Sequence, residues 1–108
     1  MIPKAQLIEM FASMRAQAPW DVEGDLLWGY FFNSSSESTL KRLADNLVGA
    51  GYQLVEIRRD EKRPRDWLHV EKVETHSPDT LDARNHEFYQ MADQYELTYD
   101  GMDVGPAR

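Results

Sequence analysis

The residues best suited to chemistry in this chain are His69 and Glu71, which alternate with apolar residues in the segment 67–71. Side chains two positions apart on a strand share a face, so an imidazole and a carboxylate would lie side by side. With His76 they suggest a metal site or an acid–base pair. Three ligands of mixed type do not identify a metal site, and His76 is expected beyond the strand end. No nucleophile motif or phosphate-binding loop accompanies them, so we predict no metal, no cofactor and no enzymatic activity.

A second polar group, the basic cluster, lies between two apolar segments and is interrupted by acidic residues. A solvated hairpin tip is the ordinary interpretation, and an anchor for RNA phosphates or an acidic protein tail is the functional alternative. The sequence has no pattern typical of RNA-recognition motifs, and the net charge of −7 repels a phosphate backbone. The basic cluster consists of Arg58, Arg59, Lys62, Arg63 and Arg65.

Length and composition limit the remaining classes of protein. A chain of 108 residues forms one domain, 1–108. The absence of cysteine excludes disulfides, thiolate nucleophiles and cysteine-bound metals, and it agrees with a reducing compartment. The first ten residues lack the pattern of a signal peptide, and the longest apolar run, 26–32, is too short to cross a membrane. We therefore expect a cytoplasmic protein with no membrane contact.

The hydrophobic pattern predicts seven elements in the order α-β-α-β-β-α-β. Apolar spacing of three and four predicts helices, and Ser36 and Ser77 are predicted to cap two of them. The βαββαβ part, 26–100, predicts an α+β ferredoxin-like sandwich: a four-stranded antiparallel sheet with two helices on one face. The expected elements are an extra N-terminal helix at 4–17, strands at 26–32, 52–58, 67–75 and 96–99, helices after Ser36 and Ser77, and a tail at 101–108.

Two covering helices leave the other face of the sheet open. We place Gly29 beneath the helices, because a glycine allows close packing, and Leu68 and Val70 beside it. The open face would then carry the proposed partner-binding residues: Trp28, Tyr30, Phe32, Trp67, His69 and Glu71. Such an apolar patch is expected to be covered. Three alternatives could cover this face: the N-terminal helix, a protein partner or a second copy of the chain.

One polar residue is predicted to have a structural role. Asn85 lies on the apolar side of its helix, where it must be hydrogen-bonded. We expect it to join this helix to the predicted turn formed by Tyr99, Asp100 and Gly101.

The chain also resembles a known family in several short segments, which span most of residues 26–106. Their order and spacing are similar to those of the regulator of ribonuclease E activity B (RraB) family, as in a short member without the acidic tail. The segments are Trp28-Gly29-Tyr30-Phe31-Phe32, Leu47-Val48-Gly49-Ala50-Gly51-Tyr52, Val55-Glu56-Ile57, Trp67-Leu68-His69-Val70-Glu71-Lys72-Val73-Glu74, Leu81-Asp82-Ala83-Arg84-Asn85 and Tyr99-Asp100-Gly101-Met102-Asp103-Val104-Gly105-Pro106.

This resemblance implies a ferredoxin-like α/β sandwich and a non-enzymatic role, in which the protein binds ribonuclease E and reduces its RNA cleavage. The residues themselves suggest a small protein-binding module, and the resemblance implies that its partner is ribonuclease E or a related RNA-processing machine. The alternative from another class is an RNA-binding module that uses the aromatic sheet face and the hairpin at 58–65.

Overall fold

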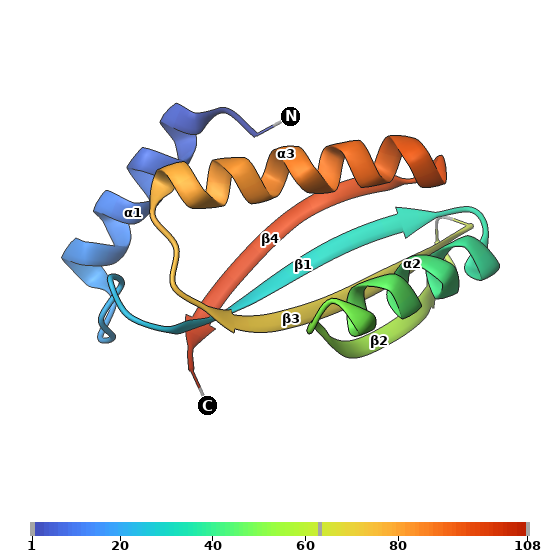
Figure 1. Ribbon diagram of the computed structural model, residues 1–108, viewed down its shortest axis with the longest axis horizontal. Helices are drawn as coiled ribbons and strands as arrows, with labels where there is room; N and C mark the ends of the chain where they lie inside the picture. The colour runs from blue at the N-terminus through green and yellow to red at the C-terminus, as the bar shows by residue number, and fades with distance from the viewer. Residues whose placement is uncertain (1, 63, 108) are drawn as a thin grey trace.

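The computed structural model describes residues 2–62 and 64–107, which form an α+β domain with three helices and a four-stranded antiparallel sheet (Figure 1). The strand order is β2-β3-β1-β4. Within the described residues, no helix has the length and apolar character needed to cross a membrane. The elements are α1 (Lys4–Gln17), β1 (Leu26–Ser34), α2 (Glu37–Gly49), β2 (Gln53–Asp60), β3 (Arg65–Glu74), α3 (Pro78–Tyr95) and β4 (Thr98–Pro106).

The helices begin where their capping residues predicted. The side chain of Ser36 accepts a hydrogen bond from the backbone N–H of Thr39 at 3.3 Å. At α3, the Ser77 side chain accepts from the Thr80 backbone at 3.2 Å, and the Thr80 hydroxyl accepts from the Ser77 backbone at 2.8 Å. Pro78 occupies the first helical position, where no N–H is needed. Local sequence therefore fixes both helix starts.

The end of the chain differs from the prediction, because β4 continues through most of the expected tail. The residues expected to form a turn lie inside the strand. Phe31 pairs with Gly101 and Phe32 pairs with Tyr99, so Asp100 is the extra residue of a β-bulge. Gly101 has a φ of +125°, which glycine adopts without strain. With this bulge, β4 pairs with residues 26–33 of β1.

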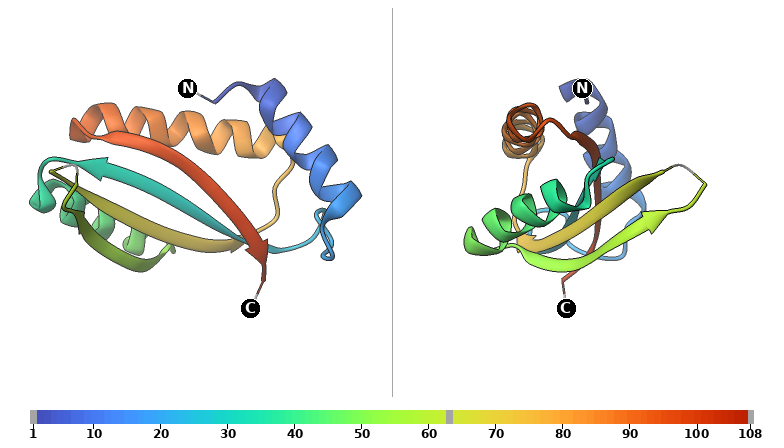
Figure 2. Two further views of the ribbon diagram at one scale, coloured as in Figure 1. Left: turned by 180° about the vertical axis from the view of Figure 1, so that it is seen from behind. Right: turned by 90° about the vertical axis from the view of Figure 1, so that its right-hand side faces the viewer.

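The main core lies between the sheet and the layer formed by α2 and α3 (Figure 2). Trp28, Tyr30 and Phe32 are fully buried there. The ring of Phe88 lies 4.9 Å from that of Tyr30 and 5.2 Å from that of Phe32. The prediction that these three aromatic residues face outward is therefore wrong.

Strand pairing explains the error. Tyr30 lies opposite Val70 and Phe32 opposite Leu68, and directly paired residues of antiparallel strands point to the same side. Leu68 and Val70 face the helices as expected, so the three aromatic residues of β1 must do so too. Gly29 consequently lies on the open face, where it accommodates side chains of the neighbouring strands and not a helix.

The N-terminal helix α1 has the predicted bounds but not the position of a lid over the open face. Leu7 and Phe11 are fully buried in the same core cluster as Trp28. The rings of Phe11 and Trp28 stack with centroids 5.9 Å apart. Lys4 forms an ion pair with Asp79 at the start of α3. Helix α1 therefore packs against the start of α3 at one end of the sheet, and within the described residues no helix crosses the opposite sheet face (Figure 2).

Truncation of a core aromatic residue tests this assignment of faces. Trp28→Ala is expected to lower the free energy of unfolding by about 3–5 kcal/mol, because it removes a fully buried ring and leaves a cavity. Urea denaturation measures the change. Val73→Ala, on the open face, is the control and should cost less than about 1 kcal/mol. Equal effects of the two substitutions would contradict the assignment.

Candidate functional site

The open face of the sheet holds half of the predicted partner-binding residues. Trp67, His69 and Glu71 of β3 lie opposite Asn33, Phe31 and Gly29 of β1, and this set faces away from α2 and α3. The other three predicted residues lie in the core. The open face therefore combines one predicted tryptophan with polar groups that surround Gly29.

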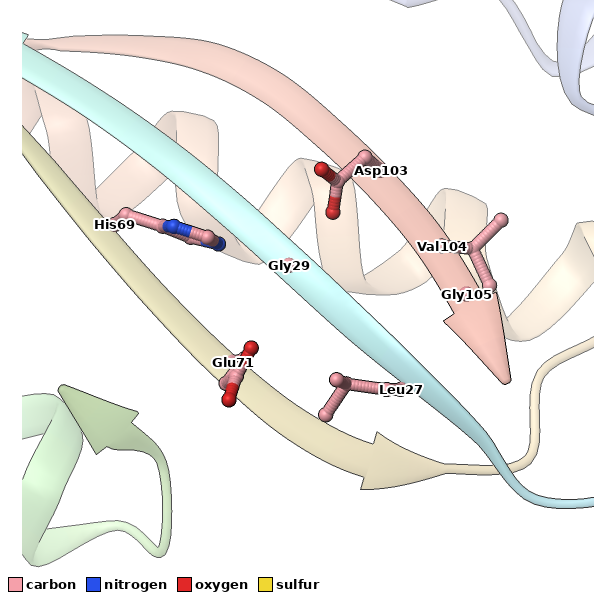
Figure 3. A pocket seen from close by; sticks show the side chains of 7 residues that line it. All are labelled: Leu27, Gly29, His69, Glu71, Asp103, Val104 and Gly105. Carbon is pink, nitrogen blue, oxygen red and sulfur yellow. The ribbon is translucent and has the colours of Figure 1, made fainter. Parts of the chain in front are cut away.

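A hollow of about 210 Å³ opens on this face (Figure 3). Its lining comes from the three strands β1, β3 and β4. The contribution of β4 was not predicted, since residues 101–108 were expected to form a tail. Alternation along 101–105, with an acidic residue between glycines, is the signal that could have revealed it. The lining residues are Leu27, Gly29, His69, Glu71, Asp103, Val104 and Gly105.

Gly29 forms the floor of the hollow. A Cβ atom at this position would lie 2.9 Å from Nε2 of His69 and closer still to Oδ1 of Asp103. The imidazole and the carboxylate thus converge above the glycine from the two neighbouring strands (Figure 3). The space that the missing side chain leaves gives these polar groups a place above the backbone of β1.

Two polar atoms of the open face lack a hydrogen-bond partner among the described residues. They are Nε2 of His69 and Nε1 of Trp67, both shielded from solvent. The imidazole of His69 is held by stacking on Phe31, with ring centroids 4.3 Å apart. An unpaired buried polar group costs about 1–3 kcal/mol, so small rearrangements that give these atoms a partner are favoured. No three His, Asp or Glu side chains within the described residues are arranged to hold a metal ion.

Two members of the basic cluster make side-chain contacts with residues of the sheet. Arg59 lies 3.4 Å from the carboxylate of Asp66, which is buried. Nε of Arg65 donates to Oδ1 of Asn33 at 2.6 Å. These contacts exist because β2 and β3 extend further than predicted and shorten the charged turn. Arg59 and Arg65 therefore have structural partners.

Two further residues of the basic cluster, Arg58 and Lys62, lie toward or within the turn. The guanidinium of Arg58 lies 3.7 Å from the carboxylate of Glu56, and both side chains are exposed. Lys62 lies in the turn itself, where its backbone N–H donates to the side chain of Asp60 at 3.0 Å. Arg63 lies outside the described residues. Arg58 and Arg59 therefore each lie beside an acidic residue, and the exposed turn agrees with the ordinary interpretation of a solvated hairpin tip.

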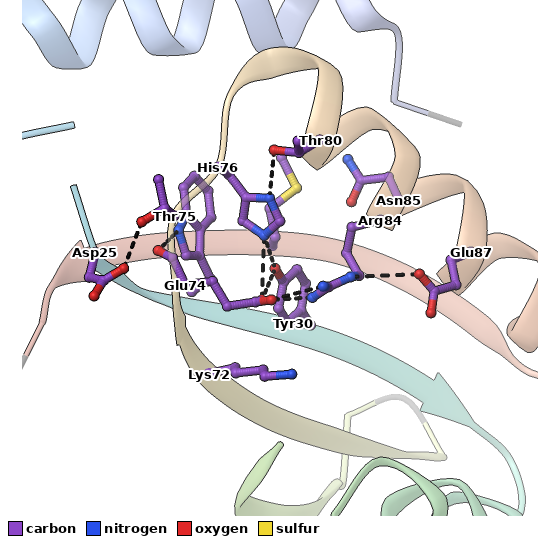
Figure 4. A network of polar contacts seen from close by, with 12 residues as sticks. Asp25, Tyr30, Lys72, Glu74, Thr75, His76, Thr80, Arg84, Asn85 and Glu87 are labelled. Carbon is purple, nitrogen blue, oxygen red and sulfur yellow. Dashed lines mark hydrogen bonds and ion pairs between the residues drawn. The ribbon is translucent and has the colours of Figure 1, made fainter. Parts of the chain in front are cut away.

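A polar network on the helix side joins the end of β3 to α3 (Figure 4). Arg84 donates to both carboxylate oxygens of Glu74, at 2.6 and 2.8 Å. The hydroxyl of Tyr30 donates to Glu74 at 3.2 Å and lies 3.2 Å from Nε2 of His76. Nδ1 of His76 lies 3.0 Å from the hydroxyl of Thr80. His76 lies beyond the strand end, as predicted, and belongs to this network and not to the hollow.

The ionisation of Glu74 follows from these contacts. Burial alone would raise the pKa of Glu74. The hydrogen bonds to His76 and Arg84, together with the charge of Arg84, have a larger, opposite effect and lower the pKa to about 2. Arg84 also lies over the rings of Tyr30 and Tyr52, 6.0 and 5.5 Å from their centroids. Such charge-assisted pairs fix geometry strongly when they are partly buried. The network therefore has the properties of a structural anchor.

Asn85 forms a second link between the helix layer and the sheet. It is buried, and its Oδ1 accepts a hydrogen bond from the hydroxyl of Tyr99 at 2.6 Å. Burial raises the pKa of Tyr99, so its hydroxyl remains a donor. The contact joins α3 to β4 at the position of the bulge at Asp100 and Gly101.

A comparison with known families gives one match, which covers nearly the whole chain. The model described as "Regulator of ribonuclease activity B" matches residues 4–104. The matched range includes every residue of the hollow except the glycine at position 105. No curated protein matches the chain significantly.

The low pKa of Glu74 predicts an acid-dependent loss of stability. Because its folded pKa of about 2 lies below the ordinary value of 4.5, the ionised pair stabilises the fold above about pH 4.5. That contribution, up to about 3 kcal/mol, should be lost as the pH falls from 4.5 toward 2. Urea denaturation of wild type and Glu74→Gln at pH 7 and pH 3 measures it.

The stability difference between wild type and Glu74→Gln should be about 2 kcal/mol smaller at pH 3 than at pH 7, because Glu74 is still partly stabilised by ionisation at pH 3. Glu9→Gln, on the exposed surface of α1, is the matched control and should show little difference at either pH. If the difference in the free energy of unfolding between wild type and Glu74→Gln were the same at both pH values, this account of the network would be contradicted.

Proposed function

The chain belongs to the RraB family of regulators of ribonuclease activity, and from this premise we propose that it acts as a non-enzymatic, protein-binding regulator. Its partner is ribonuclease E or a related RNA-processing enzyme. The open sheet face is the binding surface, and regulation consists in occupying a surface of that enzyme. The hollow offers hydrogen-bonding groups on an open sheet face, which supports a role in binding.

The observation that carries this proposal is the uncovered sheet face itself. Leu27, Phe31 and Trp67 are only partly buried there, and Val73 is 48% exposed. Aromatic and aliphatic residues that surround polar groups are typical of the centres of protein interfaces. Phe31 thus replaces the three aromatic residues that were predicted for this surface and that lie in the core.

The fold supports the same proposal. The order β2-β3-β1-β4, with α2 and α3 against one face, is the arrangement expected for a ferredoxin-like sandwich. We interpret the domain in this way. A two-layer sandwich has one sheet face without helices, so a binding surface there requires no opening of the core.

Charge supports a protein partner over RNA. The net charge is −7, and Glu71 and Asp103 line the hollow, so a phosphate backbone is repelled both at long range and at the surface. Trp28, Tyr30 and Phe32 are buried and are not available to stack on bases. RNA and a second copy of this chain are alternative occupants of the open face, and the experiment below distinguishes them.

Two valines of similar exposure provide a matched test. Val73 on the open face is 48% exposed, and Val48 on α2 is 49% exposed. Val73→Arg should weaken binding to ribonuclease E from the same organism about tenfold, because it adds bulk and charge at the interface. Val48→Arg should leave binding unchanged. Calorimetry measures affinity, and cleavage of a labelled RNA by the ribonuclease measures regulation.

The alternatives give different results. Equal affinities of the two variants would reject the open face as the binding surface. Salt-sensitive retention of single-stranded RNA by the isolated protein, with no effect on the ribonuclease, would favour the RNA-binding alternative. A wild-type dimer that Val73→Arg converts to a monomer would show that a second copy occupies the face.

A further inference from the structure

The hollow around Gly29 brings carboxylates and an imidazole together, unlike the rest of the open face. We propose that this hollow receives an arginine side chain from a basic segment of the partner. This inference rests on the proposed function only in taking the partner to be a protein. It adds the chemical class of the group that enters the hollow and the residues that hold it.

The charge of the lining favours a cation. Asp103 is exposed and, among the described residues, has no hydrogen-bond or ion-pair partner. Glu71 contributes a second carboxylate from β3, and the lining contains no lysine or arginine. The carboxylate of Asp103, in a partly enclosed space, attracts a cation more strongly than it would in open water. The same charges oppose a phosphate or carboxylate ligand.

The shape of the hollow favours a flat group. Gly29 has no side chain, and the imidazole of His69 and the carboxylate of Asp103 fill the space above it, so flat side-chain groups border the hollow there. One side is the imidazole of His69, whose plane is fixed by stacking on Phe31 at an interplanar angle of 24°. A guanidinium is planar and packs against rings, whereas an ammonium group is compact and strongly hydrated.

The positions of the polar groups also favour arginine over lysine. Asp103 and Glu71 come from strands on opposite sides of β1, and Nε2 of His69 lies beside the carboxylate of Asp103 (Figure 3). A guanidinium has five N–H donors spread in one plane, so it can donate to groups in several directions at once. It would also give Nε2 of His69, which is unpaired, a donor after a small movement of the ring.

Peptide binding by the full chain tests this inference. The probes are a fluorescently labelled peptide of alternating arginine and serine, and the same peptide with lysine in place of arginine. We expect wild type to bind the arginine peptide at least about fivefold more tightly than the lysine peptide at low salt. Fluorescence anisotropy measures both affinities.

A pair of charge-neutralising variants separates the hollow from the overall charge. Asp103→Asn should weaken binding of the arginine peptide about tenfold, which corresponds to about 1.4 kcal/mol. Asp45→Asn removes the same charge from an exposed position of α2 and should weaken binding less than twofold. Both positions are exposed, so both variants are expected to fold.

A second pair of variants tests the space above Gly29. Gly29→Ala places a methyl group among His69 and Asp103 and should weaken the arginine peptide by a similar factor. Gly49→Ala adds a methyl group where no atom lies within 4 Å and is the control. Urea denaturation shows whether Gly29→Ala is folded. If Gly29→Ala is not folded, Asp103→Asn is the variant that decides the test.

Three results would overturn the inference: no binding of the arginine peptide, equal binding of the two peptides, or equal losses in Asp103→Asn and Asp45→Asn. The proposed function is tested separately by the effect of wild type on RNA cleavage by the ribonuclease. A wild type that alters cleavage but does not bind the arginine peptide would reject only the inference. A wild type without effect on the ribonuclease would reject the proposed function, whatever the peptide result.

Discussion

The side chains of the central strand β1 alternate between two chemically different environments, and the other elements are arranged around this alternation. Trp28, Tyr30 and Phe32 point into the layer of helices, where Phe88 packs against two of them. The intervening Gly29 and Phe31 must then point to the opposite face. A shift of one residue would exchange the two sets, so the pairing of β1 with β3 determines both the core and the candidate site.

The same strand shows where sequence reasoning reaches its limit. On β3, Leu68 and Val70 alternate with polar residues, so the faces of that strand could be predicted from the sequence. The segment 26–32 is apolar at nearly every position, so alternation gives no preference for either face. Gly29 was the sole guide, and it indicates close packing equally well against a helix or against side chains of the open face.

Strand β4 was underestimated for a different physical reason. Residues 101–106 contain two glycines, an aspartate and a proline, all of which have low strand propensity. They form a strand because each pairs with β1, a tertiary interaction that local propensity does not include. Asp103 belongs to this stretch, and local propensity alone therefore does not place it at the hollow. Helix starts, in contrast, depend on local contacts such as the capping box at Ser77, and these were predictable.

The polar network on the helix side shows how this protein already holds a guanidinium. Arg84 is bound by both oxygens of Glu74 and lies over aromatic rings, the two kinds of contact that suit a planar cation. The hollow on the open face offers the same two kinds of contact, with the carboxylate of Asp103 and the ring of His69, but its lining contains no arginine or lysine. In the interior, the chain satisfies such groups itself, because an unpaired buried charge destabilises the fold. At the surface, water moderates that cost, so an incomplete set of ligands is tolerated there and remains available to an arginine from outside.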